Sequence, residues 1–279
     1  MWYLLIVTLV WAFSFSLIGV YLRGVDPWFS VLLRAGLASL VFLPFISIAN
    51  IKRDVIIRLL GIGAIQLGLM YGFYYHSFLY LTVPEVLLFT IMTPIYITLL
   101  NDLLDRQFNP TPLAAALVAV AGALLIRYDT LTSDYLFGMF LVQGANLCFA
   151  SGQVFYKRLI AANSSLTQHN VFGLFFLGAF AFSVLSFVLF GNAERLPTTT
   201  TEWSVLIYLG VVASGLGYFA WNKGATIVSV GQLAVMNNLL IPAGIIVNVA
   251  IWNREADLLR LTLGGVIILA AMFMAKKTQ

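Results

Sequence analysis

Arg34 is the residue with the clearest capacity for chemistry in this sequence, because it is a cation within a long apolar run. It lies about six residues into the run 28–49, or about 9 Å below its end at ~1.5 Å per helical residue. Glu85 opens a second run, 84–103. Charges at such depth are costly in a membrane unless they are paired or solvated. Two interpretations stay open. In the first, Arg34 pairs with Glu85 or caps backbone carbonyls; in the second, Arg34 meets a substrate carboxylate and Glu85 accepts a proton or an N–H.

Amide, hydroxyl and aromatic side chains recur at helical spacing within the other apolar runs. Gln143 and Asn146 are three residues apart and Tyr71 and Tyr75 four apart, so each pair shares one helix face. Polar groups in lipid must turn inward to find partners. The pattern predicts a polar cavity with aromatic walls, although hydrogen bonds between helices would explain any one of these residues without a ligand. The candidate substrate-binding set is Trp11, Ser14, Arg34, Tyr71, Tyr75, Glu85, Gln143, Asn146, Tyr218, Trp221, Asn237 and Asn238.

Motifs for hydrolysis, metal binding and covalent catalysis are absent from the sequence. It has no Walker-type phosphate loop, no H-E-x-x-H and no G-x-S-x-G. Its only histidines are His76 and His169, and its only cysteine is Cys148. We therefore expect no metal, no cofactor, no enzymatic activity and no ATP hydrolysis by the chain itself.

Ten apolar stretches must position these residues. Hydrophobic residues make up 61% of the chain and charged residues 9%, whereas soluble domains carry roughly 25% charged residues. Each stretch has the length that a helix needs to cross a ~30 Å hydrocarbon core. The sequence predicts an all-α integral membrane protein, and its net charge of +4 belongs to loops and indicates no nucleic-acid partner. The expected spans are 2–21, 28–49, 56–80, 84–103, 111–128, 135–156, 170–190, 203–222, 231–252 and 260–275.

The ten spans divide most naturally into two halves of five, 1–130 and 131–279. Because five is odd, two related halves would lie inverted in the membrane, an arrangement typical of transporters with a central site. Pro94 and Pro242 lie near the middle of the fourth and ninth spans. Helices interrupted at matching positions of two halves are a pointer to that site.

Orientation follows from the Lys and Arg residues of the loops, which are enriched on the cytoplasmic side. With the N-terminus inside, nine basic residues lie inside and five outside, so we expect both termini in the cytoplasm. The inside set is Lys52, Arg53, Arg58, Arg106, Lys157, Arg158, Lys223, Lys276 and Lys277, and the outside set is Arg23, Arg127, Arg195, Arg254 and Arg260.

Several strings resemble a known transporter family. The run Trp11-Ala12-Phe13-Ser14-Phe15, the run Leu33-Arg34-Ala35-Gly36 and the Pro94 element are similar to the EamA-type branch of the drug/metabolite transporter superfamily. Longer strings resemble the bacterial biotin uptake carriers of that superfamily; they are 79–90, 93–99, 126–129, 168–170, 210–222, 236–238 and 242–252.

The resemblance implies a secondary carrier of the bacterial cytoplasmic membrane that imports biotin by alternating access. Its partners would be biotin and the surrounding lipid, as a monomer or a homodimer. Asn146, Asn237 and Asn238 would bind the ureido ring, Arg34 the carboxylate, and the aromatic residues of the set the apolar parts. Two alternatives remain: an exporter of amino acids, amines or other small metabolites, and a membrane scaffold or enzyme without transport.

Overall fold

The computed structural model describes residues 2–48, 51–106, 132–228 and 230–252, together with isolated positions at 110–121 and 259–270. Within this part of the chain every regular element is helical. Seven helical stretches are long and apolar enough to cross a membrane, and the shorter apolar segment Leu239–Trp252 is part of an eighth helix. The described part of the chain is therefore all-helical, and the protein is a multi-pass membrane protein. The expected fifth and tenth spans, 111–128 and 260–275, lie almost entirely outside the described residues.

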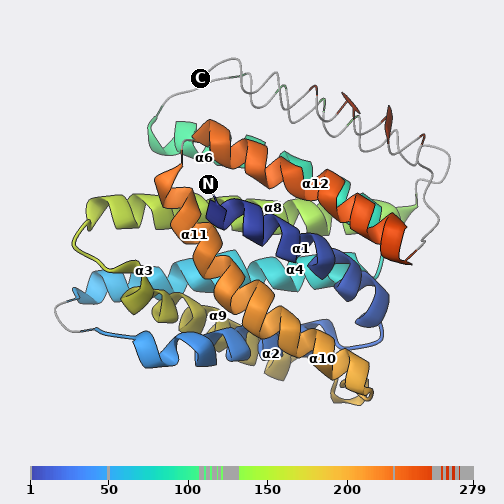
Figure 1. Ribbon diagram of the computed structural model, residues 1–279, viewed down its shortest axis with the longest axis horizontal. Coiled ribbons are helices and arrows are strands. Elements are labelled where there is room, and N and C mark those ends of the chain that lie inside the picture. Colours follow the sequence, from blue (N-terminus) through green and yellow to red (C-terminus); the bar gives the residue numbers. More distant parts are fainter. Residues whose placement is uncertain are drawn as a thin grey trace.

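The eight described spans follow the predicted order (Figure 1). Four of them are single helices, one ends in a short 3-10 turn, and three change helix type along their length. The first three spans are α1 (Trp2–Tyr21), α2 (Pro27–Phe42) with η1 (Leu43–Phe45), and α3 (Arg53–Gly63) with η2 (Ala64–Leu69) and α4 (Met70–Ser77). The fourth is α5 (Val83–Phe89), η3 (Thr90–Met92) and α6 (Thr93–Leu104). The others are α8 (Ser133–Ala162), α9 (Gln168–Phe190), α10 (Thr200–Tyr208) with η6 (Leu209–Leu216) and α11 (Gly217–Ile227), and α12 (Val230–Trp252); η5 (Ala193–Arg195) precedes α10.

Local sequence explains where several helices begin. Asp26 caps α2 by accepting a hydrogen bond from the Phe29 N–H at 2.7 Å, and Pro27 occupies the first turn. Thr132 caps α8 through the Tyr135 N–H in the same way. Thr199 and Glu202 form a capping box at the start of α10.

Pro94 and Pro242 have different effects on their helices. Pro94 lacks the N–H that would bond to the Thr90 carbonyl, and the fourth span turns into the 3-10 segment η3 just before it. The Thr93 hydroxyl donates to the Thr90 carbonyl at 2.8 Å instead. Pro242 lies inside α12, which continues through it as one helix. The expected matching interruption of the ninth span is therefore wrong. Matching irregularities lie instead in the third and eighth spans, where η2 and η6 are both π-helical.

Close contact between α3 and α9 depends on glycine. A Cβ on Gly63 would overlap the Phe175 carbonyl, and a Cβ on Gly178 would overlap the Leu60 carbonyl. Each helix thus presents a glycine to the backbone of the other, the small-residue packing that membrane helices use in place of hydrophobic burial.

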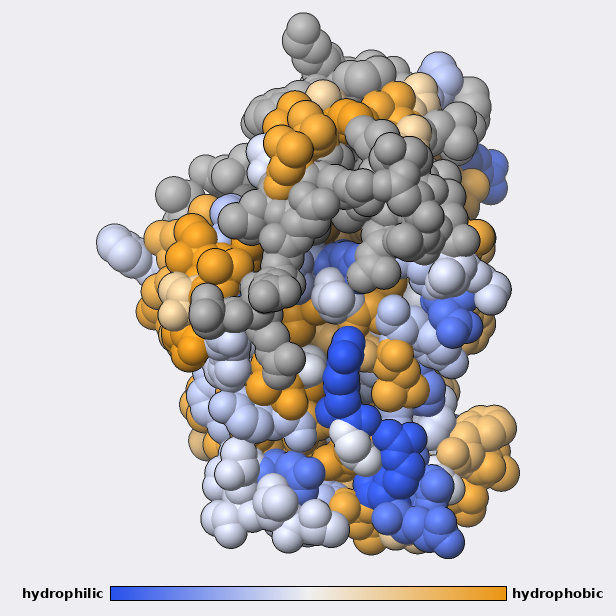
Figure 2. All heavy atoms as spheres, turned by 90° about the vertical axis from the view of Figure 1, so that its right-hand side faces the viewer, coloured by the Kyte–Doolittle hydropathy of each residue, from blue (hydrophilic) through white to orange (hydrophobic). Residues whose placement is uncertain are grey.

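The end of the bundle at which α1 finishes carries a polar surface with apolar flanks. Figure 2 views the end at which α1 finishes, with hydrophilic residues across the middle and hydrophobic ones along the flanks. There Asp26 accepts from the Asn192 N–H at 3.1 Å, and Arg195 donates to the Arg23 carbonyl at 2.9 Å. These bonds join the loop before α2 to the loop before α10.

The glycine contact predicts a position-specific loss of stability. Gly63→Ala should lower the free energy of unfolding by about 1–3 kcal/mol, because the added methyl group overpacks a backbone contact. Gly61→Ala is the matched control: a Cβ there meets nothing within 4 Å, so the helix should gain ~0.5–1 kcal/mol. Thermal unfolding of the detergent-solubilised variants measures both. Equal melting temperatures would contradict the packing argument.

Candidate functional site

A cavity lies in the middle of the bundle, where seven of the described spans converge. It encloses about 660 Å³ of space free of protein atoms, open solvent at its mouth included. Most of its walls are apolar or aromatic. The lining residues are Trp11, Ser14, Phe15, Ile18, Arg34, Met70, Tyr71, Tyr74, Thr90, Thr93, Ala145, Asn146, Phe149, Tyr218, Asn237 and Leu240.

Arg34 is a buried cation held by hydroxyl groups. Its side chain is 2% exposed, and it donates to Ser214 Oγ at 3.0 Å, Tyr75 Oη at 3.1 Å and Tyr71 Oη at 2.6 Å. Its guanidinium carbon also lies 4.0 Å from the centre of the Tyr71 ring, a cation–π contact. No carboxylate among the described residues lies within ion-pair distance of it. A guanidinium has five N–H donors, so two remain for an anion in the cavity.

Glu85 has a different place from the one expected for a partner of Arg34. It lies at the third position of α5, where its carboxylate accepts from the Thr82 N–H at 2.8 Å and the Thr82 hydroxyl at 2.7 Å. This is a capping box, in which the negative charge also meets the positive end of the helix dipole. The structural ion pair between Arg34 and Glu85 is not formed, and Glu85 does not line the cavity.

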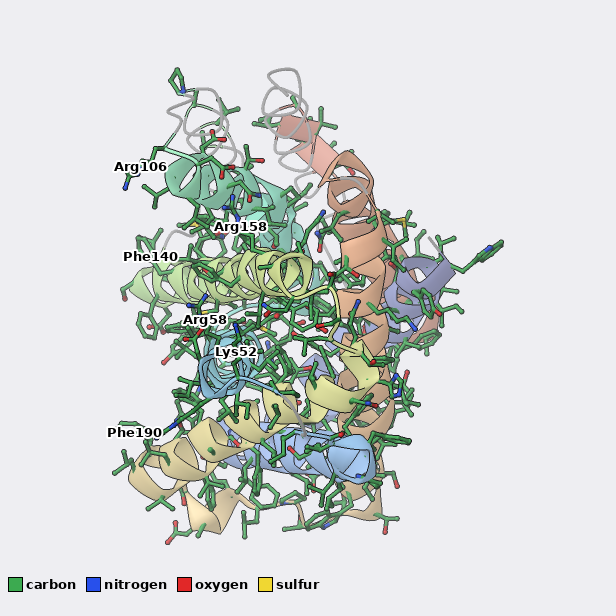
Figure 3. All side chains as sticks on the ribbon, turned by 90° about the vertical axis from the view of Figure 1, so that its left-hand side faces the viewer. Lys52, Arg58, Arg106, Phe140, Arg158 and Phe190 are labelled. Carbon is green, nitrogen blue, oxygen red and sulfur yellow. The ribbon has the colours of Figure 1, made fainter. Side chains whose placement is uncertain are left out.

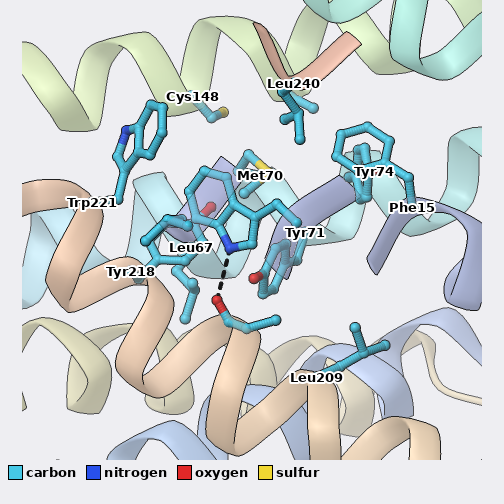
Figure 4. Close-up of a cluster of buried hydrophobic side chains, with 14 of the residues drawn as sticks. Phe15, Leu67, Met70, Tyr71, Tyr74, Cys148, Leu209, Tyr218, Trp221 and Leu240 are labelled. Carbon is cyan, nitrogen blue, oxygen red and sulfur yellow. Dashed lines mark hydrogen bonds between the residues drawn. The ribbon is translucent and has the colours of Figure 1, made fainter. Parts of the chain in front are cut away.

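Aromatic side chains form one continuous wall of the cavity. The Trp11 ring centroid lies 5.1 Å from that of Tyr218 and 4.9 Å from that of Trp221, and Phe149 packs against all three. The Trp11 indole N–H donates to the Ala213 carbonyl at 2.9 Å, the dashed line in Figure 4. Since Ala213 belongs to the π-helical segment η6, this irregular backbone positions the wall.

Asn146 lines the cavity, but its amide is largely occupied by the protein. It donates to the Phe89 carbonyl at 2.8 Å and to Gln143 Oε1 at 3.1 Å, and it accepts from the Thr93 hydroxyl at 3.2 Å. Phe89 is the last residue of α5, directly before the 3-10 turn. Asn146 therefore stabilises the interruption of the fourth span.

Two polar groups in the lining have no hydrogen-bond partner in the part of the chain that the structure describes. They are the Tyr74 hydroxyl and Nδ2 of Asn237. Buried polar groups are normally paired, so these two atoms and the two free donors of Arg34 are the sites that a ligand could satisfy.

Comparison with known proteins decides the family. The model of the EamA-like transporter family matches this chain twice, over residues 1–128 and over residues 136–276. The chain belongs to the EamA-like transporter family. The protein is therefore a membrane transporter and not an enzyme.

Similar EamA-type proteins extend along nearly the whole chain. A protein of Pseudomonas aeruginosa described as a probable biotin transporter is 51% identical, over 98% of this chain and 96% of its own length. Biotin transporters of Salmonella typhimurium and Escherichia coli K12 are 49% and 47% identical, each over 98% of this chain and 92% of its own length. A crystal structure at 19% identity, with a TM-score of 0.65 over 98% of this chain and 94% of that one, shares the fold.

The structure brings most of the sequence-predicted site residues of this family member together. Seven line the cavity: Trp11, Ser14, Arg34, Tyr71, Asn146, Tyr218 and Asn237. Three lie behind the lining and contact it: Tyr75 bonds to Arg34, Gln143 bonds to Asn146, and Trp221 packs on Trp11. Glu85 lies apart, and the side chain of Asn238 lies outside the described residues.

Several lining residues were not among the predicted site residues, although helical spacing indicates them. Phe15 and Ile18 follow Trp11 at four and seven residues, Tyr74 follows Tyr71 at three, and Phe149 follows Asn146 at three. Each thus lies on the face of a residue that was predicted. Their apolar or aromatic character made them resemble lipid-facing residues.

The two asparagines of the lining should differ in their structural roles. Asn146→Leu leaves the buried Phe89 carbonyl unpaired, so we expect a loss of about 1–3 kcal/mol in the free energy of unfolding. Asn237→Leu removes an amide nitrogen that has no partner, and the melting temperature should hold or rise. Melting curves of the purified variants test this, and equal destabilisation would contradict the assignment.

Proposed function

We propose that this protein is a secondary carrier that imports biotin across the bacterial cytoplasmic membrane. The observation that carries the proposal is the cavity. Its lining holds the Arg34 cation, two of whose N–H donors have no acceptor among the described residues, beside a mostly aromatic wall. The choice of biotin as the cargo rests on the relatives at 47–51% identity, which are described as biotin transporters or as a probable biotin transporter.

The chemistry of biotin suits the groups that the cavity leaves unpaired. A guanidinium binds a carboxylate through parallel charge-assisted hydrogen bonds, so Arg34 takes the valerate. Asn237 Nδ2 and the Tyr74 hydroxyl serve the ureido ring, whose carbonyl accepts and whose N–H groups donate. Trp11, Phe149 and Tyr218 cover the apolar bicycle. A buried cation that no carboxylate of the described residues neutralises also disfavours amines as cargo, because like charges repel.

Two inverted halves, 1–130 and 131–279, with both termini in the cytoplasm, complete the proposal. The double match of the family model supports the halves, and α8 runs opposite to α1 in the bundle (Figure 1). Lys52 and Arg58 lie at the start of α3, and Arg106 and Arg158 lie at the ends of α6 and α8, which share one end of the bundle (Figure 1). Figure 3 views the bundle from that end, and these four residues are the enrichment expected of the cytoplasmic side. Alternating access follows from this layout, with the halves rocking around the cavity.

Biotin uptake is the first test. Cells that lack their own carrier should accumulate radiolabelled biotin in a saturable manner when they produce this protein. Unlabelled biotin and desthiobiotin should compete, and an amino-acid mixture should not. Uptake blocked by amino acids, or none in cells shown to hold the protein in their membrane, would overturn biotin as the cargo.

Arg34 is the second test. Arg34→Gln keeps a group that can bond to the surrounding hydroxyls but removes the charge. Uptake should fall by at least about tenfold, because a hydrogen bond to a charged group is worth ~1.5–3 kcal/mol. Arg158→Gln is the control, since Arg158 is exposed and pairs with Asp105 at 2.9 Å, and exposed pairs contribute only about 0–1 kcal/mol. Normal uptake by Arg34→Gln at equal abundance would remove Arg34 from the site.

A further inference from the structure

A second polar layer lies behind the aromatic wall of the cavity. It consists of Gln66, Gln153 and Asn222, whose side chains are 0%, 3% and 0% exposed. Gln66 Nε2 donates to Asn222 Oδ1 at 3.1 Å, and Asn222 Nδ2 donates to the Tyr218 carbonyl at 3.1 Å. The backbone at Gly152, next to Gln153, packs directly on the Gln66 side chain. Three amides from the third, sixth and eighth spans therefore share one place in the bundle.

This amide layer is displaced from the cavity in one direction. Gln66, Gln153 and Asn222 are each four residues from a cavity-lining residue of the same span: Met70, Phe149 and Tyr218 respectively. A separation of four places both residues on one helix face, about 6 Å apart along the axis. All three steps lead toward the end of the bundle where α3 begins and α8 and α11 finish (Figure 1). This is the end where Lys52, Arg58, Arg106 and Arg158 lie.

The amide layer holds more polar atoms than the described residues satisfy. Gln66 Oε1 and both Oε1 and Nε2 of Gln153 have no hydrogen-bond partner, and neither does Nε1 of Trp221, the residue before Asn222. Trp221 packs on Trp11, and Figure 4 shows it at the opposite end of the aromatic cluster from Phe15 and Tyr74. Two acceptors and two N–H donors thus lie unpaired just beyond the wall. Unpaired buried groups need an explanation in a native protein.

We propose that the amide layer is a second binding station, which the cargo meets after the central cavity on its way to the cytoplasm. Its ligand class is a cyclic urea or amide, because such a group offers a carbonyl to the unpaired donors and N–H groups to the unpaired acceptors. The inference rests on the proposed function. It adds a step in which the ureido group passes from the cavity to Gln153 and Gln66, with Trp11 and Trp221 moving apart to admit it.

Gln153 distinguishes this role from a structural one. It forms no hydrogen bond with the described residues, so Gln153→Met removes two unpaired polar atoms at nearly constant volume. A structural role predicts unchanged transport. A station predicts impaired transport from a protein that is as stable as before, because the lost contacts are made only by the moving cargo.

The experiment compares wild type, Gln153→Met and the control Asn163→Ala in proteoliposomes with radiolabelled biotin. Asn163 is an amide at the end of the same helix, bonded to the Leu159 carbonyl. We expect Gln153→Met to lower the maximal uptake rate by about tenfold, with equilibrium binding within about twofold of wild type, the pattern of a contact made after initial binding. Its melting temperature should hold or rise. The control should match wild type in uptake and binding.

Each other outcome counts against the station. Wild-type uptake by Gln153→Met would overturn it and leave the proposed function standing. Parallel loss of binding and uptake would place Gln153 in the central site. Absence of uptake by wild type would overturn the proposed function, and the station with it. Should Gln153→Met not fold, Gln153→Asn shortens the same amide by one methylene, and normal uptake by that variant would also overturn the station.

Discussion

Burial of a positive charge with no carboxylate partner among the described residues governs the centre of this protein. Arg34 is held by two tyrosine hydroxyls of the third span and by Ser214 of the eighth. Hydroxyls accept hydrogen bonds without neutralising the charge, so the cavity keeps a positive potential that a bound anion would complete. The same three bonds join the second, third and eighth spans at one point. The position of Arg34 therefore fixes how the cavity walls on these spans lie relative to one another.

Irregular helical segments supply several of the hydrogen-bonding groups that position the cavity lining. Ser214 and the Ala213 carbonyl, which position Arg34 and Trp11, both belong to the π-helical segment η6. The 3-10 turn of the fourth span directs the Phe89 carbonyl to Asn146. Irregular backbone within a membrane is tolerated only where protein or a cavity satisfies it. The departures from ideal geometry therefore gather around the site.

The sequence predicted the eight described spans and most of the residues that meet at the cavity, but not the hydrogen-bond partners of those residues. Periodicity predicts which helix faces point inward, and so it found Trp11 and Tyr218. It cannot predict which inward group meets which, since that depends on axial offsets between helices. Glu85 therefore looked like a partner for Arg34, although it caps its own helix. Pro242 looked like a break because proline removes a donor, yet α12 continues through it. The two π-helical segments have no composition signal that separates them from ordinary helix.

The crossing of α3 and α9 has a mechanical consequence. At Gly63 and Gly178 the two helices meet backbone to backbone, without side chains between them. Side chains that change rotamer let packed helices slide, whereas a bare backbone contact has no such compliance. Because α3 belongs to the first half and α9 to the second, a rocking motion of the halves has to pivot about this contact and cannot slide across it.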